Sequence, residues 1–452
     1  MTTIRAPRFA AFIVMLGAAL AAPSHLWAAA APSIAVRAGV GGVARAGRWL
    51  PVDAEVRAGD DAFRGTIVVA WGAAVARRDI ELAPLAAARI SVLVRTIAAS
   101  PGVRVSLLDE RGAVVATRDA PLTLVPFEEP ATLCIGDVPA ATPCAARIGD
   151  NETPENARAL EFADDIIWNA AASGANQRAA EAVRLARAMR WWRDSGSVDP
   201  VVAPFDATSR LADRTSLNLA IFVGVLVVSS AAAAGRRARV AWLLGAPIAI
   251  TAGGLAFVTR GSRDVEIQAA SFVHQFQGVA QATVVMTGEV EHPAGTLLEL
   301  TPTIDDATVD VVRSAEVMES ASAQDGRGLY RHTAGRGARQ RFDLNGAISG
   351  EWLRATETPE GLTVENRSPL ALSACELRSK TPVAFGDLKN GATARIPAAG
   401  PLAAGDAVVC ALPPDWLSWS APGAAVHSRG SAFLILHIPP DASGSSSPNA
   451  AR

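Results

Sequence analysis

The stretch Leu50–Gly59, "LPVDAEVRAG", alternates apolar and polar residues along most of its length. Its apolar members are Val52, Ala54 and Val56, and its polar members are Asp53, Glu55 and Arg57. Successive side chains of a β-strand point to opposite faces, so a period of two is typical of a strand with one buried face. The stretch therefore predicts β-structure, and Pro51 suits an edge strand.

The same alternation recurs through the following sequence, in "FRGTIVVAWG" (63–72), "AARISVLVRTIA" (87–98) and "VRVSLLDERGAVVATRDA" (103–120). Roughly seven short strands with regular turn signals predict an antiparallel β-sandwich of immunoglobulin-like type over residues 31–127. The glycine-rich stretch "GVGGVARAG" (39–47) has neither a following amphipathic helix nor an acidic partner on a second strand. We therefore interpret it as a loop between strands rather than a dinucleotide site.

Residues 128–215 change character. "ATLCIGD" (131–137) reads as a short strand, and "GANQRAAEAVRLARAMRWWRDSGS" (174–197) has the apolar spacing of a helix that stops at Ser195 and Gly196. One strand and one or two helices are too few for a doubly wound sheet. We expect a small α/β or helical segment here.

Residues 264–440 return to β patterning in stretches such as "ATVVMTG" (282–288) and "SAFLILHI" (431–438), separated by turn residues. They predict a second β-rich domain. The stretch "QDGRGLYRHTAGRGARQ" (324–340) is interpreted as a solvated loop, since it lacks phosphate-binding spacing. The Ser- and Pro-rich tail 441–452 is expected to be disordered.

The N-terminus has the layout of a secretory signal peptide over residues 1–30: Arg5 and Arg8, an apolar stretch, and small residues before Pro32. Cleavage within Ala28–Ala31 fits this layout, and an uncleaved signal anchor is the alternative. Both alternatives place the chain after Pro32 outside the cytoplasm.

Two uncharged apolar runs, 216–234 and 240–259, are each close to the roughly 20 residues that span a bilayer as a helix. Arg236, Arg237 and Arg239 in the intervening segment 235–239 would be costly in hydrocarbon, so this segment is expected to be a cytoplasmic loop. The runs predict a two-helix transmembrane hairpin, and buried core helices are the alternative. The prediction places the protein in the cytoplasmic (inner) membrane, with both soluble regions periplasmic or extracellular.

The full expected fold class is thus mainly β: two β-sandwich-like extracytoplasmic domains joined by a small α/β or helical segment and a two-helix transmembrane hairpin. An exported chain can carry disulfides. Cys134 with Cys144 and Cys375 with Cys410 are close in sequence and suggest two local bridges, with free structural thiols as the alternative.

Little in the sequence points to chemistry. Cys134 and Cys144 have no histidine partner between Leu26 and Phe272, and the later histidines lack metal-ligand spacing. We expect no catalytic residue, cofactor or metal. A formal charge of −2 without a concentrated basic surface also argues against nucleic-acid binding. Trp416 and Trp419 in "WLSWS" could form a sugar platform, although core packing is the more usual role of such residues.

Two stretches resemble a group of bacterial membrane-anchored proteins: "AGRWLPVDAEVRAGDDAFRGTIVV" (46–69) and "LTVENRSPLALSACELRSKTPVAFGDLKNGATARI" (362–396). The resemblance implies an immunoglobulin-like domain, a glutamine-amidotransferase-like domain, a transmembrane segment or hairpin, and a β-rich C-terminal domain. Such proteins are often encoded beside MoxR-type ATPases and von Willebrand factor A proteins. Residues 128–215 are about half the length of the family's amidotransferase-like module, so we interpret them as a degenerate, non-catalytic version.

Two hypotheses for function follow. The first is a non-enzymatic, membrane-anchored envelope protein whose β domains bind protein partners, with its oligomeric state open. The second is a cell-wall glycan-binding or hydrolytic surface protein that uses Trp416 and Trp419.

Overall fold

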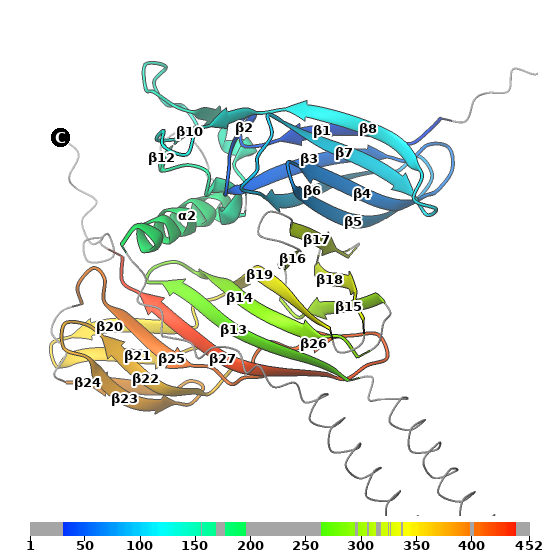
Figure 1. Cartoon of the computed structure of the whole chain (residues 1–452). Coiled ribbons are helices and arrows are strands. Elements are labelled where there is room, and N and C mark those ends of the chain that lie inside the picture. The colour runs from blue at the N-terminus through cyan, green and yellow to red at the C-terminus, as the bar shows by residue number, and fades with distance from the viewer. Residues whose placement is uncertain are drawn as a thin grey trace, which may run out of the picture.

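The computed structural model of the chain describes residues 30–154, 156–168, 177–195, 264–293, 297–304, 307–312, 318–323, 325, 327–335, 338–397 and 402–439. These residues form an N-terminal β-sandwich, a small α/β segment and a larger C-terminal β domain (Figure 1).

The N-terminal sandwich has two antiparallel layers. One is the sheet β1 (Ser33–Ala38), β3 (Trp49–Arg57) and β6 (Ala87–Arg95); the other contains β5 (Ala74–Leu82), β4 (Phe63–Trp71), β7 (Gly102–Asp109) and β8 (Val114–Pro121). Short strands β2 (Val43–Arg45) and β9 (Thr123–Val125) pair in parallel. Val52 and Val56 of β3 are fully buried while Glu55 is exposed, so the alternation in the sequence follows the core. Each such valine contributes about 1.5 to 3 kcal/mol by burial.

The α/β segment consists of a three-stranded parallel sheet and one α-helix. The strands, in the spatial order β11 (Ala146–Ile148), β10 (Thr132–Ile135) and β12 (Asp165–Trp168), are accompanied by 3-10 helices η1 (Asp150–Glu152) and η2 (Ala157–Leu160). Helix α2 (Gln177–Ser195) buries Val183, Leu185 and Met189 in the core of this segment. Helix α2 lies between the two β domains, and β10 and β12 lie beside one end of the N-terminal sandwich (Figure 1).

The C-terminal domain is built on a long antiparallel and parallel sheet. Its central strands are β13 (Val265–Phe276), β14 (Gln281–Glu291), β19 (Arg339–Ser349), β16 (Thr308–Val312) and β17 (Met318–Ser322). Beyond β13 follow β27 (Val426–His437), β25 (Ala407–Ala411), β22 (Leu372–Arg378) and β23 (Val383–Leu388). Smaller groups are β20 (Leu353–Thr358), β21 (Gly361–Asn366) and β24 (Thr393–Ile396), and β15 (Leu297–Pro302), β18 (Gly328–Thr333) and β26 (Trp419–Ser420).

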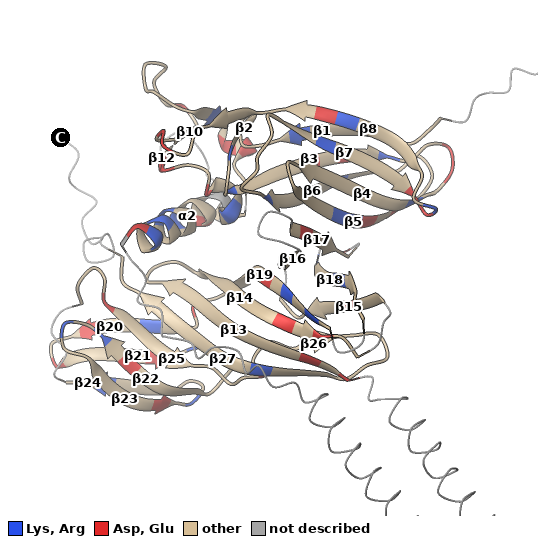
Figure 2. Cartoon of the chain, in the orientation of Figure 1, with Lys and Arg blue, Asp and Glu red and all other residues tan. Residues whose placement is uncertain are grey.

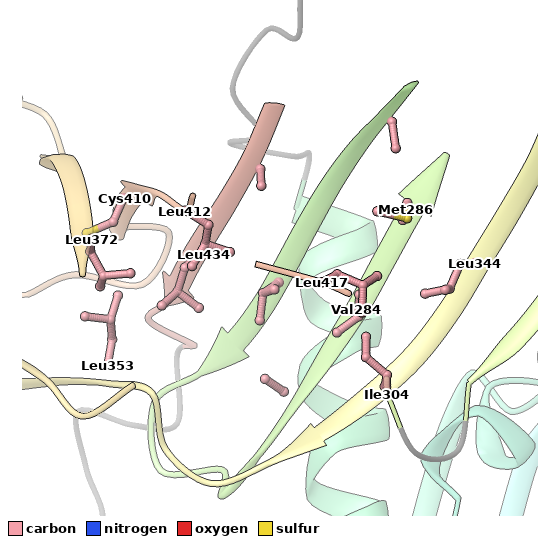
Figure 3. Close-up of a cluster of buried hydrophobic side chains, with 14 of the residues drawn as sticks. Val284, Met286, Ile304, Leu344, Leu353, Leu372, Cys410, Leu412, Leu417 and Leu434 are labelled. Carbon is pink, nitrogen blue, oxygen red and sulfur yellow. The ribbon is translucent and has the colours of Figure 1, made fainter. Parts of the chain in front are cut away.

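One large hydrophobic core serves most of this domain, and a smaller cluster of Ala407, Val409 and Ile435 packs beside Phe272 and Phe433. Figure 3 shows side chains from β14, β19, β22 and β27, with Val284, Leu344 and Leu434 among those labelled. The stretch interpreted as a solvated loop, 324–340, contributes to this core. It contains β18, whose Tyr330 is fully buried and hydrogen-bonded to His292, so that interpretation was wrong.

The transmembrane hairpin in the expected fold class must be corrected. Within the described residues α2 is the single α-helix, and no helix there is both long enough and apolar enough to span a bilayer. Four arginines recur every third residue along α2 (Arg184, Arg187, Arg190 and Arg193), and such charges are costly in hydrocarbon. The runs 216–234 and 240–259, with Arg236, Arg237 and Arg239 between them, lie outside the described residues.

The membrane as a partner and the inner-membrane location depended on that hairpin, so the structure does not support them. The predicted signal peptide is also outside the described part of the chain apart from Ala30, and the predicted disordered tail is wholly outside it. The mainly β character, in contrast, agrees with the sequence prediction.

Candidate binding cleft

A cleft of about 1830 Å³ lies between the N-terminal sandwich and the C-terminal domain. One wall comes from β1, β3, β5 and β6, and the other from β14, β16, β17 and β19. Residues of η1, η2 and α2 line it as well. In Figure 1 the sandwich is above, the C-terminal domain is below, and α2 and β17 lie between them.

A strand pairing joins the two β domains at the β17 side of the cleft. β17 runs parallel to β5, with Ala321 opposite Arg77, and the pairing makes one continuous sheet of the two domains. Beside it, Arg331 of β18 donates to the Asp79 carboxylate of β5 at 2.8 Å and to the Glu299 carboxylate at 2.7 Å. Backbone pairing and a shared arginine therefore fix the distance between the walls.

Arg158 of η2 joins the α/β segment to both β domains. Its side chain is buried and donates through Nη1 to the backbone oxygen of Asn345 at 2.8 Å and to Thr308 Oγ1 at 3.3 Å. Its guanidinium also lies 5.5 Å from the ring of Trp49 in β3, a cation–π contact. One side chain thus contacts elements of all three parts.

Asp310 of β16 lies near this arginine and directly opposite Asp343 of β19. Burial raises the pKa of Asp310 to about 6, with Arg95 and Arg158 acting against the rise and Asp343 adding to it. Its carboxyl group is therefore half-protonated near pH 6 and mostly ionised at pH 7.

Replacing Arg158 with methionine should destabilise the protein by about 2 to 4 kcal/mol, because the change removes the part-buried hydrogen bonds to the Asn345 carbonyl and to Thr308, together with the cation–π contact with Trp49. Methionine keeps most of the packing volume of the arginine stem. Urea unfolding followed by tryptophan fluorescence measures the effect. The matched control is Arg104→Met, since Arg104 pairs with Asp119 on an exposed surface and should cost less than about 1 kcal/mol. Equal losses for the two variants would contradict the role of Arg158.

Helix α2 packs on the C-terminal sheet through an aromatic group. The ring of Trp192 lies 4.2 Å from that of His274, and His274 Nδ1 is 3.0 Å from His437 Nε2. Both histidines are 1 % exposed. Burial and the neighbouring His437 lower the pKa of His274 to about 3, and burial lowers that of His437 to about 4. Both rings are therefore neutral at pH 7, one donating its hydrogen to the other.

Arginines give the sandwich wall of the cleft a basic character. Arg78 donates to the backbone oxygen of Ser91 at 3.1 Å, and Arg89 to Asp53 at 2.7 Å. Arg37 and Arg77 are exposed, and within the described residues neither side chain has an ion-pair partner. Figure 2 shows basic and acidic residues along the strands of the sandwich and several basic residues on α2.

The four cysteines form the two local bridges suggested by the sequence. Cys134 of β10 is bonded to Cys144, and Cys375 of β22 is bonded to Cys410 of β25. Neither bridge lines the cleft, so both belong to the framework.

The two tryptophans considered as a sugar platform pack into the C-terminal core. Trp419 is 8 % exposed and lies edge-on to Phe342, and the Trp416 indole donates to Ser271 Oγ at 2.9 Å. Their rings do not form an open, flat surface. No observation of the structure therefore favours the glycan-binding hypothesis.

The sequence analysis did not identify any residue of the cleft as functional. Of its strands, β3, β6 and β14 were predicted, but the meeting of β5 with β17 and of His274 with His437 depends on contacts between residues far apart in the chain. A usable signal was present in Arg89, on the polar face of the predicted strand 87–98, and in the neighbouring Arg37 and Arg77.

Comparisons with known proteins add little about function. Residues 31–123 match a family described as "Domain of unknown function (DUF8726)". No curated protein matches the chain. Among solved structures, the yeast delta-COP-I mu-homology domain complexed with Dsl1 WxWxV peptide is similar with a TM-score of 0.21 and 7 % identity, covering 39 % of this chain and 95 % of that one. Similarity at that level carries no argument about this protein.

Proposed function

We propose that this chain is a non-enzymatic binding protein that holds part of a partner protein in the cleft between its two β domains. The observation that carries the proposal is the size of the cleft. Small-molecule pockets usually measure about 300 to 1,000 Å³, and the volume of about 1830 Å³ here is better matched to a segment of polypeptide.

The fixed walls support the same proposal. The β5–β17 pairing, the Arg331 contacts and the Arg158 contacts hold the two domains together before any partner arrives. A cleft that is already formed costs little conformational entropy on binding, which favours affinity.

The residues that line the cleft favour binding over catalysis. No histidine or cysteine is among the described residues that line it, so the commonest general base and the strongest nucleophile are not available there. Among the described residues there is also no group of three or more metal-ligating side chains.

The proposal is tested by placing a photocrosslinking amino acid at Ser349 in the cleft, and at exposed Thr117 on β8 as a control. The family resemblance suggests the first partners to co-express, namely MoxR-type ATPases and von Willebrand factor A proteins, which are often encoded beside members of that group. We expect a crosslinked partner from the Ser349 position and none from Thr117. Equal yields from both positions, or none from Ser349 with any neighbouring gene product, would count against the cleft.

A further inference from the structure

Strand β6 is an edge strand of the three-stranded sheet of the N-terminal sandwich, and its outer edge faces the cleft. In the three-stranded sheet β6 pairs with β3 alone, and Arg89, Ser91 and Leu93 of β6 line the cleft. An edge strand exposes a row of backbone N–H and C=O groups that a further strand can pair with.

The register identifies which backbone groups of β6 point outward. The backbone oxygen of Pro51 accepts from Gly39 N at 2.8 Å, so the polar groups of Pro51 face away from β6. Pro51 lies opposite Leu93, hence the N–H and C=O of Leu93 point away from β3. The period of two extends this to Ser91 and Arg89. Arg78 confirms it for Ser91, since it donates to the outward backbone oxygen of that residue.

These outward groups have no backbone partner within the described part of the chain. The backbone hydrogen bonds outside the sheets include none to Arg89, Ser91 or Leu93. The guanidinium of Arg78 donates to this edge at Ser91, so an added strand would have to displace one side-chain hydrogen bond there. Three successive outward positions are enough to pair with an extended segment of about five or six residues.

The side chains around this edge favour an acidic occupant. Arg89 lies on the edge strand, Arg37 belongs to the same cross-strand row as Asp53 and Ser91, and Arg77 and Arg78 lie on the neighbouring β5. Asp53 already accepts from Arg89 and Ser91. An added strand with carboxylates on every second residue would meet the remaining positive charge.

From this geometry we infer that the partner adds an extended, acidic segment to the outer edge of β6, inside the cleft. The inference rests on the proposed function and names its mode of binding, which is strand addition. A second copy of this chain fits less well, because pairing two β6 edges would bring the arginines of both copies together.

The probe is a fluorescein-labelled ten-residue peptide that alternates threonine and glutamate, measured by fluorescence anisotropy on the full chain. A peptide alternating threonine and lysine is its control. We expect the acidic peptide to bind at least about tenfold more tightly than the basic one, and its binding to weaken as salt is raised. Equal binding of the two peptides, or no binding of either, would overturn the inference.

Leu93→Pro tests the backbone of the edge. Proline removes the outward N–H, while the pairing with β3 does not use it. Leu93→Ala is the matched control, because it shortens the same side chain and keeps the donor. We expect at least tenfold weaker peptide binding in Leu93→Pro than in Leu93→Ala, and equal binding in the two variants would refute strand addition.

Amide hydrogen exchange on the unmodified chain provides a readout that does not depend on the folding of Leu93→Pro. The acidic peptide should slow exchange at Ser91 and Leu93 and leave Val92 unchanged, whereas unchanged exchange at all three would refute the inference. Light scattering provides a further test. If it shows a dimer of the unmodified chain that Leu93→Pro disrupts, the occupant of the β6 edge is a second copy of this chain and the inference of an acidic partner is wrong. If Ser349 still crosslinks a protein while the peptide tests fail, the inference fails and the proposed function stands.

Discussion

Unfolding at pH 4.5 should require about 3 to 5 kcal/mol less free energy than at pH 7.5, chiefly because of the buried His274–His437 pair. The pKa values of these residues in the folded protein, about 3 and about 4, lie below the ordinary value of 6.5. The unfolded chain therefore binds more protons as the pH falls below 6.5, and each histidine lowers the stability by up to about 1.4 kcal/mol per pH unit.

Other buried groups modify this slope. His292, whose pKa burial and His332 lower to about 4, acts in the same direction. Asp310 acts in the opposite direction, since its raised pKa of about 6 means that its ionisation destabilises the folded state as the pH rises from 3.8. Glu161, whose pKa burial also raises, acts in the same direction as Asp310. These two carboxyl groups oppose three histidines, so the net effect of acid remains destabilising.

Urea unfolding between pH 7.5 and 4.5 measures this dependence. The double variant His274→Phe/His437→Phe should flatten it, because two groups that take up protons on unfolding are gone. His427→Ala is the control, since His427 is mostly exposed near Asp264 and should leave the slope unchanged. A double variant with the wild-type slope would show that other groups dominate. Because the ring of Trp192 contacts that of His274, amides of α2 should also lose exchange protection early in the acid transition.

The elements of the fold were more predictable from the sequence than their arrangement. Val52 and Val56 allow β3 to be predicted, because a strand with one buried face needs an apolar residue at every second position, and this pattern is visible within the strand's own sequence. The contacts that build the cleft join distant segments, and no pattern within either segment predicts them. Ser322 and Arg77 are 245 residues apart and meet only because β17 adds to the edge of β5.

The buried histidines show the same limit. His274 and His437 are separated by 163 residues, and they meet because β13 and β27 are parallel neighbours with Phe276 opposite His437. Judged by local spacing alone they appear scattered, and that spacing carries no information about their burial. The interpretation of residues 324–340 as a solvated loop was wrong for a related reason. Their Gly- and Arg-rich composition does not indicate the short strand β18, whose Tyr330 enters the core.

Loss of the Cys375–Cys410 bridge should destabilise the C-terminal domain by about 3 to 4 kcal/mol, the value expected in the chain-entropy model for a loop of this size. The two cysteines are 35 residues apart in sequence and both are fully buried. A loss of this size is a large part of the typical 5 to 15 kcal/mol stability of a domain. The Cys375→Ala/Cys410→Ala variant removes the bridge with little change in volume, and urea unfolding measures the result.

The strand pairing explains why this bridge matters more than its position in the core alone suggests. Ser373 pairs with Ala411 and Glu376 with Val409, so Ala374 and Cys375 together face the single residue Cys410 in a β-bulge. Ala374 has a φ of 48°, a left-handed conformation that costs an alanine energy. Without the bridge, nothing covalent holds β22 to β25 where their register slips.

Cys134→Ala/Cys144→Ala is the comparison, because its cysteines are 10 residues apart and the shorter loop predicts a loss of about 2 to 3 kcal/mol. Mass spectrometry of the chain purified without reductant should show both pairs oxidised, and four free thiols or an equal stability of all variants would contradict a structural role for the bridges.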